Sequence, residues 1–322
     1  MLSTDPLGKA SGENFPVAPA VLPRAYREHL HALYAFARLV DDIGDRGPGA
    51  APPGSRSASP DAAQTGLDAV QAHPDEVQAD PGTVRADPDA VRDDLDAVRD
   101  DLDRVFRGVT ARIPALRPLC RTVHRCGLPR APFEALLAAN HQDQTVTDYV
   151  DRGQLLQYCR LSANPVGHLV LGVFGVRITA ARRADSDAVC TALQLIEHLQ
   201  DIGEDAARGR IYLPREDRDR YGVRPGDLRA GTASPDLRRL VLAEARWAEE
   251  LLRRGSGLVR TLHGWPRLAV AGYVAGGAAA LRDLRRAGGD TLSQPAGSRP
   301  AGRRRTDLVI AGLQILRKGE LR

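Results

Sequence analysis

The sequence predicts an all-α protein built as a single helical domain. Apolar residues recur three and four positions apart, as on one face of a helix, over residues 26–40, 132–143, 154–174, 187–205, 236–262 and 267–286. Alternation of apolar and polar residues, which is typical of strands, is scarce, and no strand–helix–strand rhythm appears. Apolar residues make up 43% of the 322 residues and aromatic residues only 4%, so leucine, valine and alanine must fill most of the core.

A low-complexity segment separates the first helical pattern from the rest. Residues 46–66 are rich in glycine, proline, alanine and serine, and six copies of a seven-residue repeat follow. Each copy keeps one apolar position, a valine, and three copies begin with proline, which breaks a continuous helix. The last copies fit a helix near 91–107. We therefore expect a helical domain made of residues 1–45 and 91–290, with a disordered or surface insertion at 46–90; a partner-binding segment is the alternative.

The distribution of charge argues against a nucleic-acid partner. The chain has 45 basic and 41 acidic residues, and all the basic residues except Lys9 and Lys318 are arginines spread along the chain. A nucleic-acid footprint would cluster them. The first 30 residues lack the apolar core of a signal peptide. The uncharged stretch 268–281 is shorter than the about 20 residues that a membrane span needs. We expect a cytoplasmic protein.

The C-terminal tail, residues 291–322, is basic. Its Arg303–Arg305 run precedes the apolar stretch DLVIAGLQIL, and this combination suits the surface of an anionic membrane. A tail that stays in solvent is the alternative. Peripheral contact with the inner face of the membrane is therefore left open as an expectation.

The first acidic motif lies in HALYAFARLVDDIGD, residues 31–45. Asp41 and Asp45 are four residues apart, so a helix places both carboxylates on one face, and Tyr34 and Arg38 extend the same face. Like charges at this spacing repel, and a bound cation would relieve the repulsion. The alternative is a solvated acidic helix end, which the helix dipole disfavours.

The second acidic motif lies in LQLIEHLQDIGEDAARGRIYLP, residues 193–214. Asp201 and Asp205 repeat the four-residue spacing, and Gln194 and Glu197 share the face of Asp201. Two such helices in one helical protein are far more specific than one. Hard carboxylate oxygens suit Mg²⁺, so the predicted metal ligands are Asp41, Asp45, Glu197, Asp201 and Asp205.

This arrangement predicts chemistry on a diphosphate. Metal ions held by two acidic walls would grip the phosphates and make them a leaving group. Arg208, Arg210 and Tyr212 follow the second motif and would donate hydrogen bonds to phosphate oxygens.

These motifs resemble the squalene/phytoene synthase family, whose members are α-helical isoprenoid synthases with two aspartate-rich motifs facing a central cavity. YAFARLVDDIGD is similar to the first motif of the family, QDIGEDAARGRIYLP to the second, and QYCRLSANPVGHLVLGVFG (157–175) to its Tyr-Cys segment. The resemblance covers residues 12–45 and 91–285. It implies a helical bundle of the isoprenoid-synthase type, an isoprenoid diphosphate substrate and Mg²⁺. It also places Tyr158 on the tyrosine implicated in catalysis; a buried structural tyrosine is the alternative.

Departures from the family pattern point to one of its branches. Ala163-Asn164-Pro165-Val166-Gly167 stands where the family usually reads Ala-Gly-x-Val-Gly, and Glu197 and Gln200 replace an Asn and an Arg. With GENFPVA (12–18) and the Gln-Asp pair, these residues resemble the bacterial hydroxysqualene synthases of hopanoid biosynthesis. That branch removes pyrophosphate from presqualene diphosphate and captures the cation with water. A head-to-head condensing synthase and a non-catalytic helical partner subunit are the alternatives.

The resemblance assigns roles to the candidate residues. The expected catalytic residues are Tyr158, Asp41, Asp45, Asp201 and Asp205. The expected substrate contacts are Tyr34, Arg38, Asn164, Gln194, Arg210 and Tyr212. Asn164 either places its amide in the cavity or adjusts helix packing, and Glu197 is either a metal ligand or a surface acid. Other enzymes of the squalene and hopene pathway are the expected protein partners.

Overall fold

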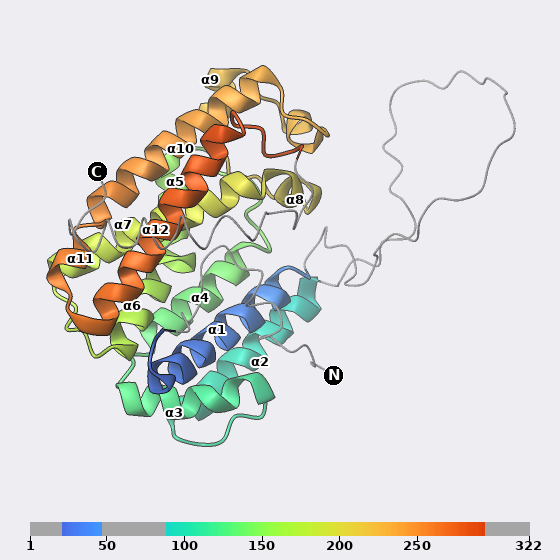
Figure 1. The fold of residues 1–322 in the computed structure, drawn as a ribbon. Helices are drawn as coiled ribbons and strands as arrows, with labels where there is room; N and C mark the ends of the chain where they lie inside the picture. The colour runs from blue at the N-terminus through green and yellow to red at the C-terminus, as the bar shows by residue number, and fades with distance from the viewer. Residues whose placement is uncertain (1–20, 47–87, 294–322) are drawn as a thin grey trace, which may run out of the picture.

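The structure is a computed structural model that describes residues 21–46 and 88–293. In these ranges the protein is helical (Figure 1), and the only β-type pairing there is an isolated bridge between Asp148 and Ile211. The elements in chain order are α1 (Arg24–Gly44), α2 (Pro88–Phe106), η1 (Pro114–Leu116), α3 (Arg117–Cys126), α4 (Ala131–Gln142), α5 (Arg152–Ser162), α6 (Asn164–Val173), α7 (Ala180–Gln200), α8 (Ile202–Ala207), α9 (Arg215–Tyr221), η2 (Pro225–Arg229), α10 (Pro235–Gly255), α11 (Leu258–Thr261) and α12 (Gly264–Arg286). The predicted all-α fold is confirmed.

Two of the predicted helices are interrupted in the structure. The segment 154–174 divides at Ala163 into α5 and α6, because Pro165 in the first turn of α6 has no N–H to continue the ladder of hydrogen bonds. The segment 187–205 divides at Asp201, whose φ of −107° and ψ of 14° leave the helical range. The second break falls inside the acidic motif, so α7 and α8 each carry part of it.

The buried side chains form two apolar cores that share helices. One core combines α1, α2 and α3 with Phe133 and Leu137 of α4. The other is built mainly from α7, α10 and α12, and it also takes Ala139 from α4 and Leu171 from α6. Because α4 and α6 contribute to both cores, the described helices pack as one body (Figure 1). α7 packs against α5, α6, α10, α11 and α12, so it lies centrally in the second core.

Gly255, the last residue of α10, allows a close approach of α10 to α7. A Cβ atom at this position would lie 2.6 Å from the Asp185 carbonyl oxygen and 2.7 Å from the Val189 nitrogen, both of them backbone atoms. We expect Gly255→Ala to lower the free energy of unfolding by about 1–3 kcal/mol, as overpacking does. Urea unfolding measures the loss.

A matched control for this substitution is Gly272→Ala in α12. A Cβ there meets no atom within 4 Å, so alanine should stabilise the helix by about 0.5–1 kcal/mol. Equal changes in the two variants would contradict the packing account.

Most of the predicted insertion (46–90) and of the basic tail (291–322) lies outside the described residues, and those two assignments stay predictions. The helix predicted near 91–107 corresponds to α2, which begins slightly earlier, with Pro88 at its first position. Within 21–46 and 88–293, none of the helices combines the length and apolar character required to cross a bilayer.

Candidate active site

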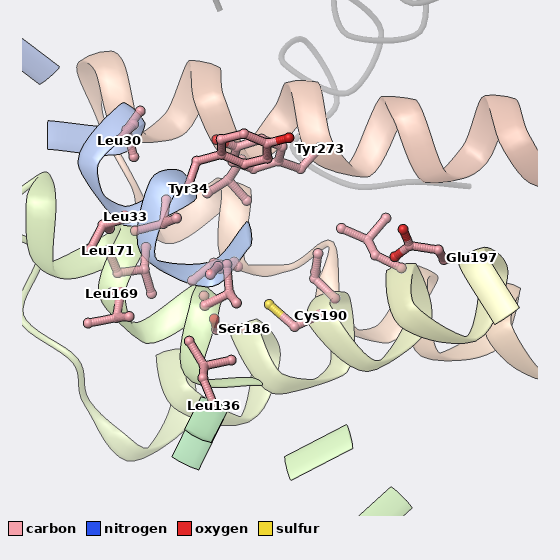
Figure 2. A pocket seen from close by; sticks show the side chains of 18 residues that line it. Leu30, Leu33, Tyr34, Leu136, Leu169, Leu171, Ser186, Cys190, Glu197 and Tyr273 are labelled. Atoms are coloured by element: carbon pink, nitrogen blue, oxygen red, sulfur yellow. The ribbon is translucent and has the colours of Figure 1, made fainter. Parts of the chain in front are cut away.

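An apolar cavity of about 260 Å³ lies between the two cores (Figure 2). Its walls come chiefly from α1, α6 and α7, and they consist of Leu30, Leu33, Tyr34, Ala37, Leu136, Val166, Gly167, Leu169, Val170, Leu171, Ser186, Val189, Cys190, Leu193, Glu197, Leu258, Val270 and Tyr273. The residues from α1 and those from α7 each follow a spacing of three and four, so each helix presents one continuous stripe. Such a chamber suits a long hydrocarbon chain.

Both stripes lead into the acidic motifs. On α1 the position one turn beyond Ala37 is Asp41, and on α7 the position one turn beyond Glu197 is Asp201. Figure 2 shows Glu197 at one end of the cavity and Leu30 and Leu169 toward the other. The cavity therefore has an apolar end and an acidic end.

Arg210 joins the two acidic motifs. Its Nη1 donates to Asp45 Oδ1 at 2.7 Å, and its Nη2 donates to the Gly44 carbonyl at 2.8 Å. The backbone N–H of Arg210 donates to the Asp205 carbonyl at 2.8 Å. The C-terminal end of the first acidic motif thus lies against the turn at Arg210, which follows Asp205 of the second motif. Arg208, also predicted as a phosphate donor, lies 3.9 Å from Asp45.

The first motif is crowded with negative charge. Two effects raise the pKa of Asp41 to about 7: the surrounding protein removes water from the carboxylate, and the neighbouring Asp45 carboxylate repels its charge. The Asp41 side chain is 51% exposed, so water weakens the effect of the surrounding protein, whereas the repulsion from Asp45 remains. Arg38 offsets part of it, with Nη1 3.2 Å from Asp41 Oδ2 and Nη2 2.8 Å from Asp42 Oδ1.

The donor set fits a magnesium ion that is shared with a diphosphate. Among the residues that the structure describes, no three His, Cys, Asp or Glu side chains converge on one metal position. Mg²⁺ does not require such a cage, because it usually keeps several waters and binds through one or two carboxylates and substrate phosphates. Asp41 and Asp45, at the C-terminal end of α1, offer such carboxylates, and a bound cation would relieve the repulsion through which Asp45 helps to raise the pKa of Asp41.

Tyr158 lies in a buried polar cluster beside the acidic end. Its hydroxyl donates to Asp143 Oδ2 at 2.8 Å, and the Tyr212 hydroxyl donates to Asp143 Oδ1 at 3.3 Å. Burial raises the pKa of Asp143, while the positive Arg210 and the two phenol hydrogen bonds oppose the rise. Neither tyrosine is among the described residues that line the large cavity.

Aromatic rings hold this cluster in place. Tyr212 stacks on His198 with ring centroids 3.7 Å apart and on Tyr149 with centroids 5.6 Å apart. Asp143, Tyr149 and His198 were not predicted as site residues. Asp143 lies at the end of the predicted helix 132–143, and its pairing with Tyr158 spans two helices, so no periodic pattern reports it.

Three other predicted substrate contacts have different environments. Tyr34 lines the cavity. Asn164 is buried, and its amide oxygen accepts a hydrogen bond of 3.0 Å from the Thr191 hydroxyl of α7. Gln194 Nε2 lies 3.3 Å from His198 Nε2. Within the described part of the chain, Asn164 and Gln194 are absent from the cavity walls, and the contacts of Asn164 favour the packing role.

Comparison with known proteins agrees with this architecture. A family model described as squalene/phytoene synthase matches residues 9–306, nearly the whole chain. The chain belongs to the squalene/phytoene synthase family. The predicted family is therefore confirmed, and its members' all-α fold is the one described above.

Several members of the squalene/phytoene synthase family resemble the chain over most of its length. Hydroxysqualene synthase of Zymomonas mobilis is 31% identical over 254 residues, which cover 78% of this chain and 71% of the relative. Presqualene diphosphate synthase of Rhodopseudomonas palustris is 30% identical over 231 residues, 71% and 68% of the two chains. The crystal structure of squalene synthase HpnC from Alicyclobacillus acidocaldarius superposes with a TM-score of 0.63 at 37% identity, covering 83% of this chain and 86% of that one. Membership in the squalene/phytoene synthase family makes the chain an isoprenoid synthase that acts on an isoprenoid diphosphate.

Proposed function

We propose that the chain converts presqualene diphosphate to hydroxysqualene by Mg²⁺-dependent loss of pyrophosphate and capture of the resulting cation by water. The main support is the apolar cavity whose α1 and α7 walls lead into Asp41, Glu197 and Asp201. Similarity to a relative named hydroxysqualene synthase supports the choice of reaction. The hydrocarbon would lie along the oily walls and the diphosphate at the acidic end.

The proposed ligands of Mg²⁺ are Asp41, Asp45, Glu197, Asp201 and Asp205. An ion held there would supply charge neutralisation of the diphosphate, which would allow the C–O bond to break with its electron pair on the leaving pyrophosphate. Arg38, already held at the acidic end by Asp41 and Asp42, would contact the phosphate oxygens. The apolar walls would exclude stray water, so that only a water at the acidic end would add to the cation and then pass its proton to the departing pyrophosphate.

The substrate and product are lipids, so the proposal includes peripheral contact with the inner face of the membrane. A cytoplasmic location and transfer of the product to other enzymes of the squalene and hopene pathway belong to the same proposal. Membrane contact and transfer of the product follow from the chemistry of an apolar product, which does not diffuse freely through water.

Incubation with presqualene diphosphate and Mg²⁺ in ¹⁸O-labelled water tests the reaction. Mass spectrometry should find a C30 alcohol that carries the label, because the hydroxyl oxygen comes from solvent. Omission of Mg²⁺ is the control and should abolish the product. A hydrocarbon without label as the sole product would refute water capture.

A second candidate is head-to-head condensation of two prenyl diphosphates. The relative named presqualene diphosphate synthase is almost as similar as the hydroxysqualene synthase, at 30% against 31% identity. Farnesyl diphosphate supplied alone separates the two reactions. Rapid consumption to a C30 product supports condensation, whereas activity on presqualene diphosphate alone supports the leading proposal.

A third reading, a non-catalytic helical partner subunit, makes a different prediction. Such a subunit does not need a working acidic site. Isothermal titration with Mg²⁺ and a diphosphate analogue tests this directly. Absence of any binding would favour the partner role, and binding that requires both ligands together would favour an enzyme.

A further inference from the structure

The carboxylate of Asp143 is the hub of the buried cluster beside the acidic end. Asp143 follows the last turn of α4 and is 8% exposed. One of its oxygens accepts the hydroxyl of Tyr158 from α5, and the other accepts the hydroxyl of Tyr212 from the segment after α8. A single side chain therefore receives hydrogen bonds from two tyrosines that lie 54 positions apart in the sequence.

Packing prevents the two phenols from turning elsewhere. The Tyr158 and Tyr212 rings lie with centroids 5.5 Å apart, and Tyr149 contacts both, at 5.5 Å and 5.6 Å. His198 of α7 covers the remaining side of Tyr212, at 3.7 Å with an angle of 10° between the planes. Close-packed rings have few alternative rotamers, so the direction of each hydroxyl is fixed by the position of Asp143.

This geometry sets what the phenol oxygens can do. A tyrosine hydroxyl has one proton to donate and lone pairs to accept with. The proton of Tyr158 is directed at Asp143, at 2.8 Å. The oxygen is thereby left as an acceptor, and donation to a carboxylate makes it richer in electrons. A phenol held in this way can stabilise a cation or accept a proton, but it does not donate to a diphosphate.

We propose that Asp143 is a positioning residue that holds Tyr158 as an electron-rich acceptor beside the acidic end of the cavity. The inference deepens the proposed function and rests on it, because a carbocation is what such an oxygen stabilises. Asp143 does not touch the substrate in this account. It acts through Tyr158, whose hydroxyl it accepts at 2.8 Å.

Asp143→Asn tests the positioning role with little change in size. The amide has lost the charge and one acceptor, so it cannot receive both phenols as the carboxylate does. We expect kcat for pyrophosphate release to fall about 10²-fold. The KM, and the Kd of Mg²⁺ with a diphosphate analogue measured by titration calorimetry, should stay within about threefold, because binding contacts are unchanged.

The matched control is Asp101→Asn, which alters a second buried aspartate. Asp101 is 2% exposed, and its oxygens accept the backbone N–H groups of Arg112 and Ile113 at 2.8 Å and 2.7 Å. This variant should lose stability but keep the kcat of its folded fraction. An equal fall of kcat in both variants would show a general effect of buried charge and would overturn the inference.

A double-mutant cycle decides whether Asp143 acts through Tyr158. If it does, Asp143→Asn combined with Tyr158→Phe lowers kcat no further than the stronger single change. Multiplicative losses overturn the inference. The urea midpoint of the same four proteins gives a second readout, in which the two single losses should be non-additive.

The two proposals fail in different ways. If the wild-type protein releases no pyrophosphate from any isoprenoid diphosphate, the proposed function fails, and additive urea midpoints then overturn the positioning role as well. If the wild-type protein is active and Asp143→Asn has normal kcat, the proposed function stands and only the positioning role is lost.

Discussion

Asp41→Asn should lower the rate of pyrophosphate release at least about 10²-fold, while the fold becomes no less stable. The loss follows from the removal of one of the carboxylates proposed to hold Mg²⁺. The stability follows from the neighbouring Asp45, whose charge helps to raise the pKa of Asp41 to about 7. A folded-state pKa above the ordinary 3.8 means that an ionised Asp41 opposes folding, and the neutral amide removes this penalty at pH 8.

Turnover should fall while stability does not, so the two measurements together distinguish the loss of a metal ligand from damage to the fold. Turnover and thermal unfolding are measured on the same preparation, with Asp100→Asn on the exposed face of α2 as the control. The control should change neither quantity. Near-normal turnover in Asp41→Asn would overturn the assignment of Asp41 to the cation, whatever its effect on stability.

Arg152→Met should lower the free energy of unfolding by about 3–5 kcal/mol. The Arg152 guanidinium of α5 reaches Asp217 of α9 at 2.9 Å and Glu244 of α10 at 2.7 Å, and it lies 4.7 Å from the Trp247 ring centroid. Both carboxylates are buried, at 5% and 3% exposure. Methionine keeps much of the packing but leaves two buried acids without their cation, which is far more costly than the loss of a surface pair.

Chemical unfolding at several pH values measures this loss. Burial raises the pKa of Glu244 to about 7 against an ordinary 4.5, and Arg152 opposes the rise. The stability that protonated Glu244 contributes is therefore complete below pH 4.5 and is lost as the pH rises through 7. The loss of unfolding free energy in Arg152→Met should therefore be larger at pH 8 than at pH 5.

The control is Arg92→Met, since Arg92 forms an exposed pair with Asp89 at 3.3 Å. Its loss should cost less than about 1 kcal/mol. Equal losses in Arg92→Met and Arg152→Met would mean that the contacts of Arg152 with its two buried carboxylates are no stronger than a surface pair.

Periodicity within a helix was enough to place Tyr34 with Asp41, and Glu197 with Asp201, on shared helix faces, whereas the central cavity was expected from the family resemblance and its apolar wall residues were not predicted. The stripe from Tyr34 through Asp41 and the stripe that ends at Glu197 and Asp201 are local patterns, so a single helix carries all their information. Pro165 in the sequence is a signal for the helix break at Ala163, because proline lacks the N–H of a helix interior. The break at Asp201 was not predicted, since apolar spacing continues across it and only backbone geometry reveals it.

Contacts between distant segments had no such signal. Asp45 and Arg210 are 165 residues apart, and Asp143 and Tyr158 lie on either side of a loop. Neither pair shares a helix face, so spacing in the sequence could not join them. The Arg152 triad escaped prediction for the same reason, because its three charges come from three helices.

The shared stripe on α7 restricts how the depth of the chamber can change. One helix bears both the oily wall and Glu197, so each residue added between Ser186 and Glu197 would rotate the acid by about 100° and displace it by about 1.5 Å. A single insertion would turn the carboxylate away from the cavity. Family members that accept substrates of different length are therefore expected to differ in the size of the side chains along the cavity wall. Where the length of α7 differs, it should differ by whole turns of about 5.4 Å rather than by single residues.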